Sequence, residues 1–265
     1  DLSVMLAVFW LAVVAVLIVA YYAAYLYRFK LDALGARGRI AIGLSFVLLL
    51  AVGFVFTNNF SLLMRPEKWV DYFDARGGTL LNLDDPTLWP RYLHMITAAV
   101  AVGGLVRALW WRRAERRGDP AAAQHVRAGL RWFGYGTLVQ VLVGAWYLIS
   151  QPPRLLDLYL LGSAAHTAVL AAGIALTLAM IVLALRGKLA ATTGLLVVVV
   201  SLMAVNRELL RVAALEPYFS PGELEVRPEY SPLFVFLGVL AVGVAVVVYL
   251  LRLAWRATRE EGGAA

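Results

Sequence analysis

Cysteine is absent from this 265-residue sequence, and histidine occurs only three times. Without cysteine, disulfides, thiolate metal sites, iron–sulfur clusters and thioether-attached haem are excluded within the chain. Charged residues make up only 15% of the sequence against 62% hydrophobic residues, which excludes an ordinary soluble enzyme and a disordered chain. The mean hydropathy of +0.77 belongs to the whole length rather than to one segment. These features predict an integral membrane protein whose cofactors, if present, have ligands other than cysteine.

Seven apolar runs are long enough to cross a bilayer, which takes about 20 helical residues for about 30 Å of hydrocarbon. We therefore predict an all-α fold, a polytopic bundle of seven transmembrane helices that forms a single integral membrane domain over 1–265. The predicted spans are 3–27, 39–59, 88–111, 128–150, 155–185, 189–213 and 231–254.

The first apolar run is interpreted as a true span. It lacks the basic region and the small-residue cleavage site of a signal peptide, and it is longer than a signal-peptide core. The sequence begins at Asp1 rather than at Met, so whether an N-terminal extension was removed stays open.

Lys and Arg are concentrated at one set of helix ends, and most acidic residues lie at the other set. Because basic residues are enriched in cytoplasmic loops, we predict that the N-terminus is outside and the C-terminus inside. The two longer loops, about 60–87 and 214–230, are then on the outer side. A formal charge of +7 is explained by these short basic loops, so we expect contact with membrane lipid and no nucleic acid.

His94 and His166 are the two histidines predicted to lie inside the membrane. From the helix rise, His94 is about 6–10 Å below the outer surface, and His166, nine residues after Asp157, is about 14 Å below it. Imidazoles at similar depth on different helices suit the two axial positions of a haem b, so both are predicted metal ligands, with one or two haems in the chain. Met203 is the alternative second axial ligand, and His125 is predicted to be a solvated residue at the inner surface.

Further polar residues are predicted at the same outer level. Arg207 and Arg211 share a helix face and are expected to neutralise haem propionates, while Glu208 either accepts a proton from quinol or only pairs with Arg211. The inner half is assigned only scattered polar residues such as Gln140, which argues against a proton or ion path across the membrane. The predicted cofactor-binding residues are His94, His166, Arg91, Arg207, Arg211, Asn206, Asn58 and Asn59, with Glu208 as the catalytic residue.

Two runs carry a resemblance to a known family. TNNFSLLMRPEKW closes the second span, and LWPRYLHMITAAVAVGGLVRALWW forms the third. Over roughly 39–150 the chain resembles the middle of cytochrome bd quinol oxidase subunit I, which implies that His94 is a low-spin haem b ligand and that quinol is oxidised on the outer side. The family also has a histidine in its first helix and a long quinol-binding loop, and this chain has neither. An oxygen-reducing oxidase is therefore disfavoured.

The combined prediction is a haem b-containing subunit in a bacterial inner (cytoplasmic) membrane, which transfers electrons between the quinone pool and periplasmic c-type cytochrome partners. Such a subunit belongs to a hetero-oligomeric quinol:acceptor oxidoreductase. One alternative is a haem-free membrane anchor or scaffold of a redox complex. Another is a copper-tolerance or transporter-type protein, suggested by the LHxxxAAxxxGG pattern that begins at Leu93, although no cluster of Met or Cys supports copper binding.

Overall fold

The computed structural model describes residues 2–30, 35, 37–74, 76–220 and 230–261. The predicted all-α class is confirmed, because these residues form helices and no strands. Seven of the helices are long and apolar enough to cross a membrane, so the chain is a multi-pass membrane protein. The chain divides into two compact units, Asp1–Phe219 and Ser220–Ala265, which are described separately.

The first unit holds all but the last of the membrane helices. Their bounds are α1 (Ala7–Phe29), α3 (Arg37–Leu63), α5 (Leu88–Glu115), α6 (Ala122–Ile149), α8 (Ala164–Leu185) and α9 (Leu189–Leu215). Five short elements adjoin them, namely η1 (Leu2–Leu6), η2 (Pro66–Lys68), α4 (Asp71–Asp74), α7 (Pro153–Asp157) and η3 (Leu158–Gly162). The second unit holds α10 (Ser231–Glu261).

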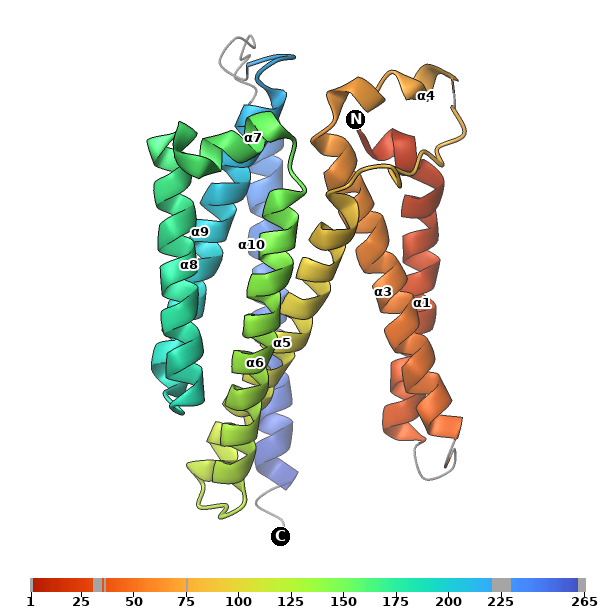
Figure 1. Cartoon of the computed structure of the whole chain (residues 1–265). Coiled ribbons are helices and arrows are strands. Elements are labelled where there is room, and N and C mark those ends of the chain that lie inside the picture. The colour runs from red at the N-terminus through yellow and green to blue at the C-terminus, as the bar shows by residue number, and fades with distance from the viewer. Residues whose placement is uncertain (1, 31–34, 36, 75, 221–229, 262–265) are drawn as a thin grey trace. The chain divides into compact units, whose positions relative to one another are not determined.

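Consecutive membrane helices of the first unit pack in pairs, α1 with α3, α5 with α6, and α8 with α9 (Figure 1). The α5–α6 pair is the closest in approach, because Gly104 and Gly129 face each other. A Cβ atom on Gly129 would lie 2.6 Å from the Gly104 carbonyl oxygen and 2.9 Å from the Ala108 nitrogen. Small residues of this kind let two helix backbones pack directly against each other. The main apolar core continues from this contact through Leu130 and Phe133.

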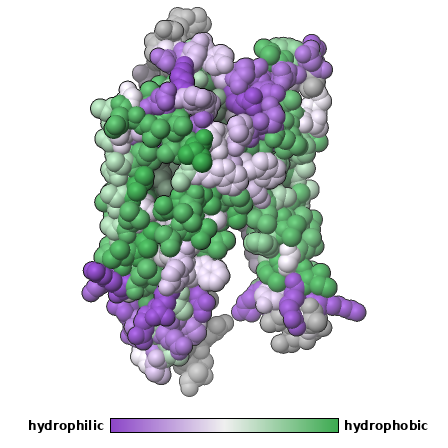
Figure 2. Space-filling view, in the orientation of Figure 1, coloured by the Kyte–Doolittle hydropathy of each residue, from purple (hydrophilic) through white to green (hydrophobic). Residues whose placement is uncertain are grey.

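Hydrophilic side chains gather at both ends of the helices, and hydrophobic side chains cover the length between them on the face seen in Figure 2. We call the end at which α3 stops and α5 starts the outer end, after the predicted orientation. That orientation stays a prediction from the Lys and Arg distribution.

The loop from α3 to α5 is fixed to the outer end by buried polar contacts. Asp85 is 4% exposed, and its carboxylate accepts hydrogen bonds from the backbone N–H of Thr87 (2.8 Å), from the Thr87 hydroxyl (3.0 Å), from Asn82 Nδ2 (3.4 Å) and from the Ser61 hydroxyl. The indole N–H of Trp69 donates to the carbonyl of Leu62 (2.9 Å). Of the other predicted outer loop, 214–230, residues 221–229 lie outside the described part of the chain.

The predicted span 155–185 is wrong at its start, since the membrane helix α8 begins only at Ala164. Leu161 has a φ of 72°, a left-handed conformation that ends the preceding helical turn. Gly162 follows, and a Cβ there would lie 2.5 Å from the Asp157 carbonyl oxygen, so a side chain does not fit. His166 therefore lies in the first turn of α8, and its predicted depth of about 14 Å, which assumed an unbroken helix from Asp157, is too large.

Candidate functional site

The predicted site residues come from the outer ends of four membrane helices. Helices α3 and α5 supply two each, α8 supplies one, and α9 supplies the remainder. They are Asn58 and Asn59 on α3, Arg91 and His94 on α5, His166 on α8, and Asn206, Arg207, Glu208 and Arg211 on α9. Contacts within the first unit join some of these side chains and leave others apart.

His94 lies in the second turn of α5 and contacts α6. Its Nε2 is 3.1 Å from the side-chain amide of Gln140. Its ring lies against Gly144, where a Cβ would be 3.3 Å from the His94 Cε1 atom and 3.5 Å from Nδ1. The prediction that Gln140 belongs to the inner half is therefore wrong, because α6 runs antiparallel to α5 and brings this residue level with His94. The spacing of Gln140 and Gly144 at i and i+4 is the sequence signal that identifies this face.

His166 contacts a different set of residues. Its Nδ1 is 2.9 Å from the hydroxyl of Ser163, and its ring makes an edge-on contact with Tyr159 at a centroid distance of 5.2 Å. The Tyr159 hydroxyl donates to the backbone carbonyl of Asn206 (3.3 Å), which connects this histidine to α9. Among the hydrogen bonds and ring contacts of the described residues, none joins His94 to His166.

Arg91 and Arg207 approach each other at Phe60 of α3. The Arg207 guanidinium lies over the Phe60 ring, 4.7 Å from its centroid, and Arg91 donates a long hydrogen bond of 3.4 Å to the Phe60 carbonyl. Arg91 also lies 5.1 Å from the centroid of the Tyr147 ring. The ion pairs found in the described part of the chain include neither Arg91 nor Arg207. Glu208 attracts Arg207 electrostatically from beyond ion-pair distance. Arg91 has no carboxylate partner of its own in the described part of the chain, so it is suited to a ligand that accepts its hydrogen bonds.

Glu208 and Arg211 form a separate ion pair. Both guanidinium contacts are short, at 2.6 and 3.0 Å, and the two side chains are 56% and 36% exposed. The structural alternative for Glu208, a pair with Arg211, is thus present. Whether Glu208 also accepts protons stays a prediction.

Asn58 has a structural contact, and both Asn58 and Asn59 have a side-chain atom that is free to bind a ligand. The backbone N–H of Asn82 donates to Asn58 Oδ1 (3.1 Å), so Asn58 helps to hold the α3–α5 loop. Its Nδ2 atom and the Oδ1 atom of Asn59 have no hydrogen-bond partner.

Buried side-chain atoms without a hydrogen-bond partner concentrate in the predicted site. Seven such atoms occur among the described residues, and only Trp10 Nε1 belongs to a residue outside the predicted set. Leaving one such group unpaired costs about 1–3 kcal/mol, so these atoms are expected to find partners in water or in a ligand. The other six are Asn58 Nδ2, Asn59 Oδ1, Arg91 Nε, His94 Nδ1, His166 Nε2 and Asn206 Oδ1.

The two histidines differ in how their hydrogen bonds fit ligation of a haem b. His166 has the arrangement of an axial ligand, with Nδ1 held by Ser163 and Nε2 free. His94 has the reverse arrangement, since Nε2 contacts Gln140 and Nδ1 is free. Ligation by His94 Nδ1 requires the Gln140 amide oxygen to accept the Nε2 proton, and an amide can turn to present either end. The alternative ligand Met203 is 40% exposed on α9.

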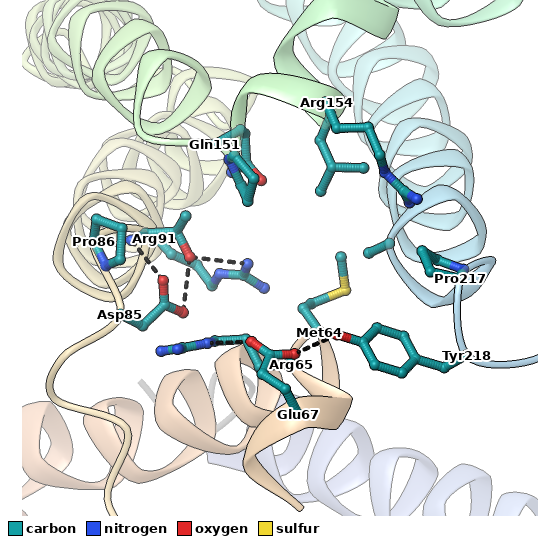
Figure 3. Close-up of a pocket in the computed structure, with 14 residues that line it drawn as sticks. Met64, Arg65, Glu67, Asp85, Pro86, Arg91, Gln151, Arg154, Pro217 and Tyr218 are labelled. Carbon is teal, nitrogen blue, oxygen red and sulfur yellow. Dashed lines mark hydrogen bonds and ion pairs between the residues drawn. The ribbon is translucent and has the colours of Figure 1, made fainter.

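A cavity of about 450 Å³ opens at the outer end of the first unit (Figure 3). The sequence analysis did not predict this cavity, and Arg91 is the one lining residue that belongs to the predicted site. It lies within the size range of ligand sites. Apolar walls come from Met64, Leu155 and Ala214, and the polar groups include Glu67 and Asp85. The complete lining is Met64, Arg65, Glu67, Asp85, Pro86, Thr87, Arg91, Gln151, Pro152, Arg154, Leu155, Ala214, Pro217 and Tyr218.

Glu67 connects two sides of this cavity. Its carboxylate accepts hydrogen bonds from Arg65 Nε (2.9 Å) and from the Tyr218 hydroxyl (3.1 Å), so η2 is linked to the end of α9. Partial burial raises the pKa of Glu67, but the hydrogen bonds from Arg65, from the backbone and from Tyr218, together with the charge of Arg65, hold the pKa below its ordinary value. The hydrogen bond between Tyr218 and Glu67 also raises the pKa of Tyr218. Glu67 is therefore ionised at neutral pH and Tyr218 remains a donor.

Comparisons of the chain with protein-family models, with curated proteins and with solved structures found no match. The resemblance to cytochrome bd subunit I over 39–150 therefore stays a prediction. The described residues also include no group of three or more His, Cys, Asp or Glu side chains that could hold a metal ion. The histidines are accordingly considered as single ligands.

Proposed function

We propose that this chain is a haem b-containing membrane subunit that transfers electrons between the quinone pool and periplasmic c-type cytochrome partners. The observation that carries the proposal is the concentration of unpartnered buried atoms on the residues expected to hold the haem, together with two arginines that have no ion pair. We place the complex, a hetero-oligomeric quinol:acceptor oxidoreductase, in the bacterial inner membrane.

The haem iron, when bound, supplies one-electron chemistry by changing between its ferric and ferrous states. His166 offers Nε2 to it, and Ser163 fixes the orientation of that imidazole through Nδ1. His94 offers Nδ1, and Gln140 fixes its ring from α6. Such partners of ligand histidines set the tautomer and the ring orientation.

Arg207, whose guanidinium lies over the Phe60 ring, is proposed to bind a haem propionate. A guanidinium group pairs well with a carboxylate. Neutralising this carboxylate would remove the cost of burying either charge alone.

The second candidate is the haem-free anchor, and one observation favours it. Each intramembrane histidine already has one hydrogen bond, between His94 and Gln140 and between His166 and Ser163, as an imidazole with a purely structural role would have. The second nitrogen of each ring has no hydrogen-bond partner, and this supports the haem proposal over the anchor.

A spectrum of the purified protein in its complex decides between them. We expect a reduced-minus-oxidised spectrum of haem b that is lost in His94→Ala and in His166→Ala. His125→Ala is the matched control, because His125 also has a hydrogen bond (accepted from Arg107, 3.2 Å) and a ring contact (with Trp111, 4.1 Å between centroids), but at the inner end. The absence of haem from the wild-type protein, or equal spectral loss in all three variants, would overturn the proposal.

Glu208 is the proton acceptor predicted from the sequence, and Glu208→Gln tests it. This change preserves shape and removes the base. Slower haem reduction by quinol with unchanged haem content would support the catalytic role. Unchanged reduction kinetics would leave Glu208 as the partner of Arg211 alone.

A further inference from the structure

The cavity at the outer end combines features that select among ligands. Its apolar walls come from Met64, which follows α3, from Leu155 on α7 and from Ala214 on α9. Its charged groups are of both signs, since Glu67 and Asp85 line it together with three arginines, Arg65, Arg91 and Arg154. Both carboxylates already accept hydrogen bonds from the protein. A neutral, flat ring with polar atoms at two edges meets apolar walls and both kinds of polar partner.

Among the two carboxylates, Glu67 is the one with acceptor capacity to spare. A carboxylate offers about four lone-pair positions. Asp85 accepts four hydrogen bonds from within the protein and is buried. Glu67 accepts two side-chain hydrogen bonds, from Arg65 and Tyr218, and one from the backbone, and its side chain is 47% exposed. A ligand hydroxyl in the cavity therefore has Glu67 as its acceptor.

Arg91 is the donor with capacity to spare. It lines the same cavity, it has no carboxylate partner in the described part of the chain, and its two hydrogen bonds, to Phe60 and Thr87, are long at 3.4 and 3.5 Å. By contrast, Arg65 is engaged with Glu67 and Asp84.

The depth of the cavity matches an amphipathic ligand that lives in the membrane. Its lining comes mostly from the loops and short elements just beyond the ends of α3, α6 and α9 and just before α5, and only Arg91 and Ala214 lie on membrane helices. At this depth a ring with polar groups lies at headgroup level while an apolar tail remains in the hydrocarbon.

We infer that this cavity binds the headgroup of a quinol, with one quinol hydroxyl donating to the Glu67 carboxylate and Arg91 donating to the other quinol oxygen. The inference rests on the proposed function, because it names the place where the quinol of that function binds. It also predicts a preference between redox forms. A quinol hydroxyl donates to Glu67, whereas a quinone has only acceptor oxygens and makes no hydrogen bond with a carboxylate.

The test measures binding rather than turnover. The full chain, in its complex and in lipid nanodiscs, is titrated anaerobically with short-chain menaquinol and ubiquinol analogues and with the corresponding quinones. We expect the quinol to bind about tenfold more tightly than the quinone, in keeping with one hydrogen bond to a charged group. An arylazido derivative of the same analogue should label the stretches Pro152–Leu155 and Ala214–Tyr218.

Four variants sharpen the test. Glu67→Gln is expected to weaken quinol binding about tenfold and to remove the preference for quinol over quinone, because an amide both donates and accepts. Tyr218→Phe keeps Glu67 and loses only its second hydrogen bond, so a smaller loss is expected. Ala214→Phe adds a ring at the wall of the cavity and should abolish binding, provided that circular dichroism shows the fold intact, because Ala214 also packs in an apolar cluster with Leu155. Glu115→Gln is the control, since Glu115 is also paired with an arginine, Arg112, but at the inner end.

The outcomes are separable from those of the haem proposal. Tight binding that none of the cavity variants changes, labelling elsewhere in the chain, or occupation by phospholipid that quinol does not displace would overturn the inference. If haem is absent and quinol still binds in the cavity with these effects, the proposed function fails and the cavity assignment stands. If haem is present and the cavity variants bind quinol as the wild type does, only the cavity assignment fails.

Discussion

The contact between α5 and α6 differs from the group of predicted site residues at the outer end in how completely the protein's own atoms satisfy one another. At Gly104 and Gly129 the two backbones touch, and a single added Cβ would collide with backbone atoms. At the outer end, six buried polar atoms on the predicted site residues lack a partner. The first region is complete, because its contacts are all within the protein. The second is incomplete in its hydrogen bonds within the protein, which supports the proposal that it binds a ligand.

The largest effect is expected from disturbing the complete region. Gly129→Val would put side-chain atoms against the Gly104 carbonyl oxygen and the Ala108 nitrogen, neither of which can move without shifting a helix. We expect a loss of about 3 kcal/mol in the free energy of unfolding, measured by denaturation in detergent. Gly103→Val is the control, because nothing lies within 4 Å of a Cβ at Gly103. Equal losses in both variants would mean that close packing at Gly129 is unimportant.

In the incomplete region, Gln140→Leu should lower haem affinity by about tenfold to a hundredfold, the usual cost of removing the partner of a ligand histidine. The measurement is haem retained by the purified complex during dilution or competition with apomyoglobin. Gln124→Leu is the control at the exposed inner end of the same helix. Full haem retention in Gln140→Leu would contradict a role of His94 as an axial ligand.

Two hypotheses for the carboxylate that receives the quinol hydroxyl, Glu67 in the cavity or Glu208 on α9, predict opposite kinetics of haem reduction by quinol. Glu208 does not line the outer cavity, and Arg211 contacts both of its oxygens, so a quinol in the cavity and Glu208 as its base exclude each other. With quinol in the cavity, Glu67→Gln raises KM about tenfold and Glu208→Gln has wild-type kinetics. A lower kcat in Glu208→Gln with an unchanged KM in Glu67→Gln would instead favour the prediction from the sequence.

The smallest effect is expected from acidification of the α3–α5 loop. The hydrogen bond from Lys68 is the main cause that lowers the pKa of Asp84, and Arg65 adds to it. Partial burial raises the pKa of Glu67, but the hydrogen bonds from Arg65, from the backbone and from Tyr218, together with the charge of Arg65, lower it overall. A carboxyl whose folded pKa is depressed stabilises the fold above its unfolded pKa of about 4, and this stability disappears as the pH falls through the folded value.

Because these ion pairs are partly exposed, the loss on acidification is expected to stay below about 1 kcal/mol. The fluorescence of Trp69, whose indole contacts α3 beside this loop, should change between about pH 5 and pH 3. Because Asp84→Asn removes this carboxylate at every pH, part of the fluorescence change should already be present at neutral pH in this variant. A signal that is flat over this range would show that the ion pairs do not hold the loop.

The number of membrane helices followed from the sequence because apolar length is a property of each segment alone. The position of α8 did not, because the break at Leu161 depends on a backbone conformation that leucine rarely adopts. Likewise the two histidines were identified by their rarity, but their partners were not. Gln140 is 46 residues from His94 in the chain, and only the crossing of α5 and α6 brings them together.

The outer cavity was missed for the same reason. Arg91 was the only lining residue in the predicted set, and Glu67, Leu155 and Ala214 come from three segments that nothing in the sequence connects. The polar cluster was found because each member is unusual for a membrane span. A cavity has no such local signature, since it arises from how several ordinary helix ends are arranged.

The break at Leu161 and Gly162 also has a consequence for the order of assembly. The groups that orient His166, namely Tyr159, Ser163 and the Thr167 hydroxyl bonded to Leu161 N–H, lie within seven residues of it in the chain. Contacts this local form early and at little loop-closure cost. The environment of His94 forms only when α6 has entered the membrane beside α5. During synthesis, however, α5 and α6 are translated before α8. The surroundings of His94 are therefore made first, and those of His166 are added when α8 follows.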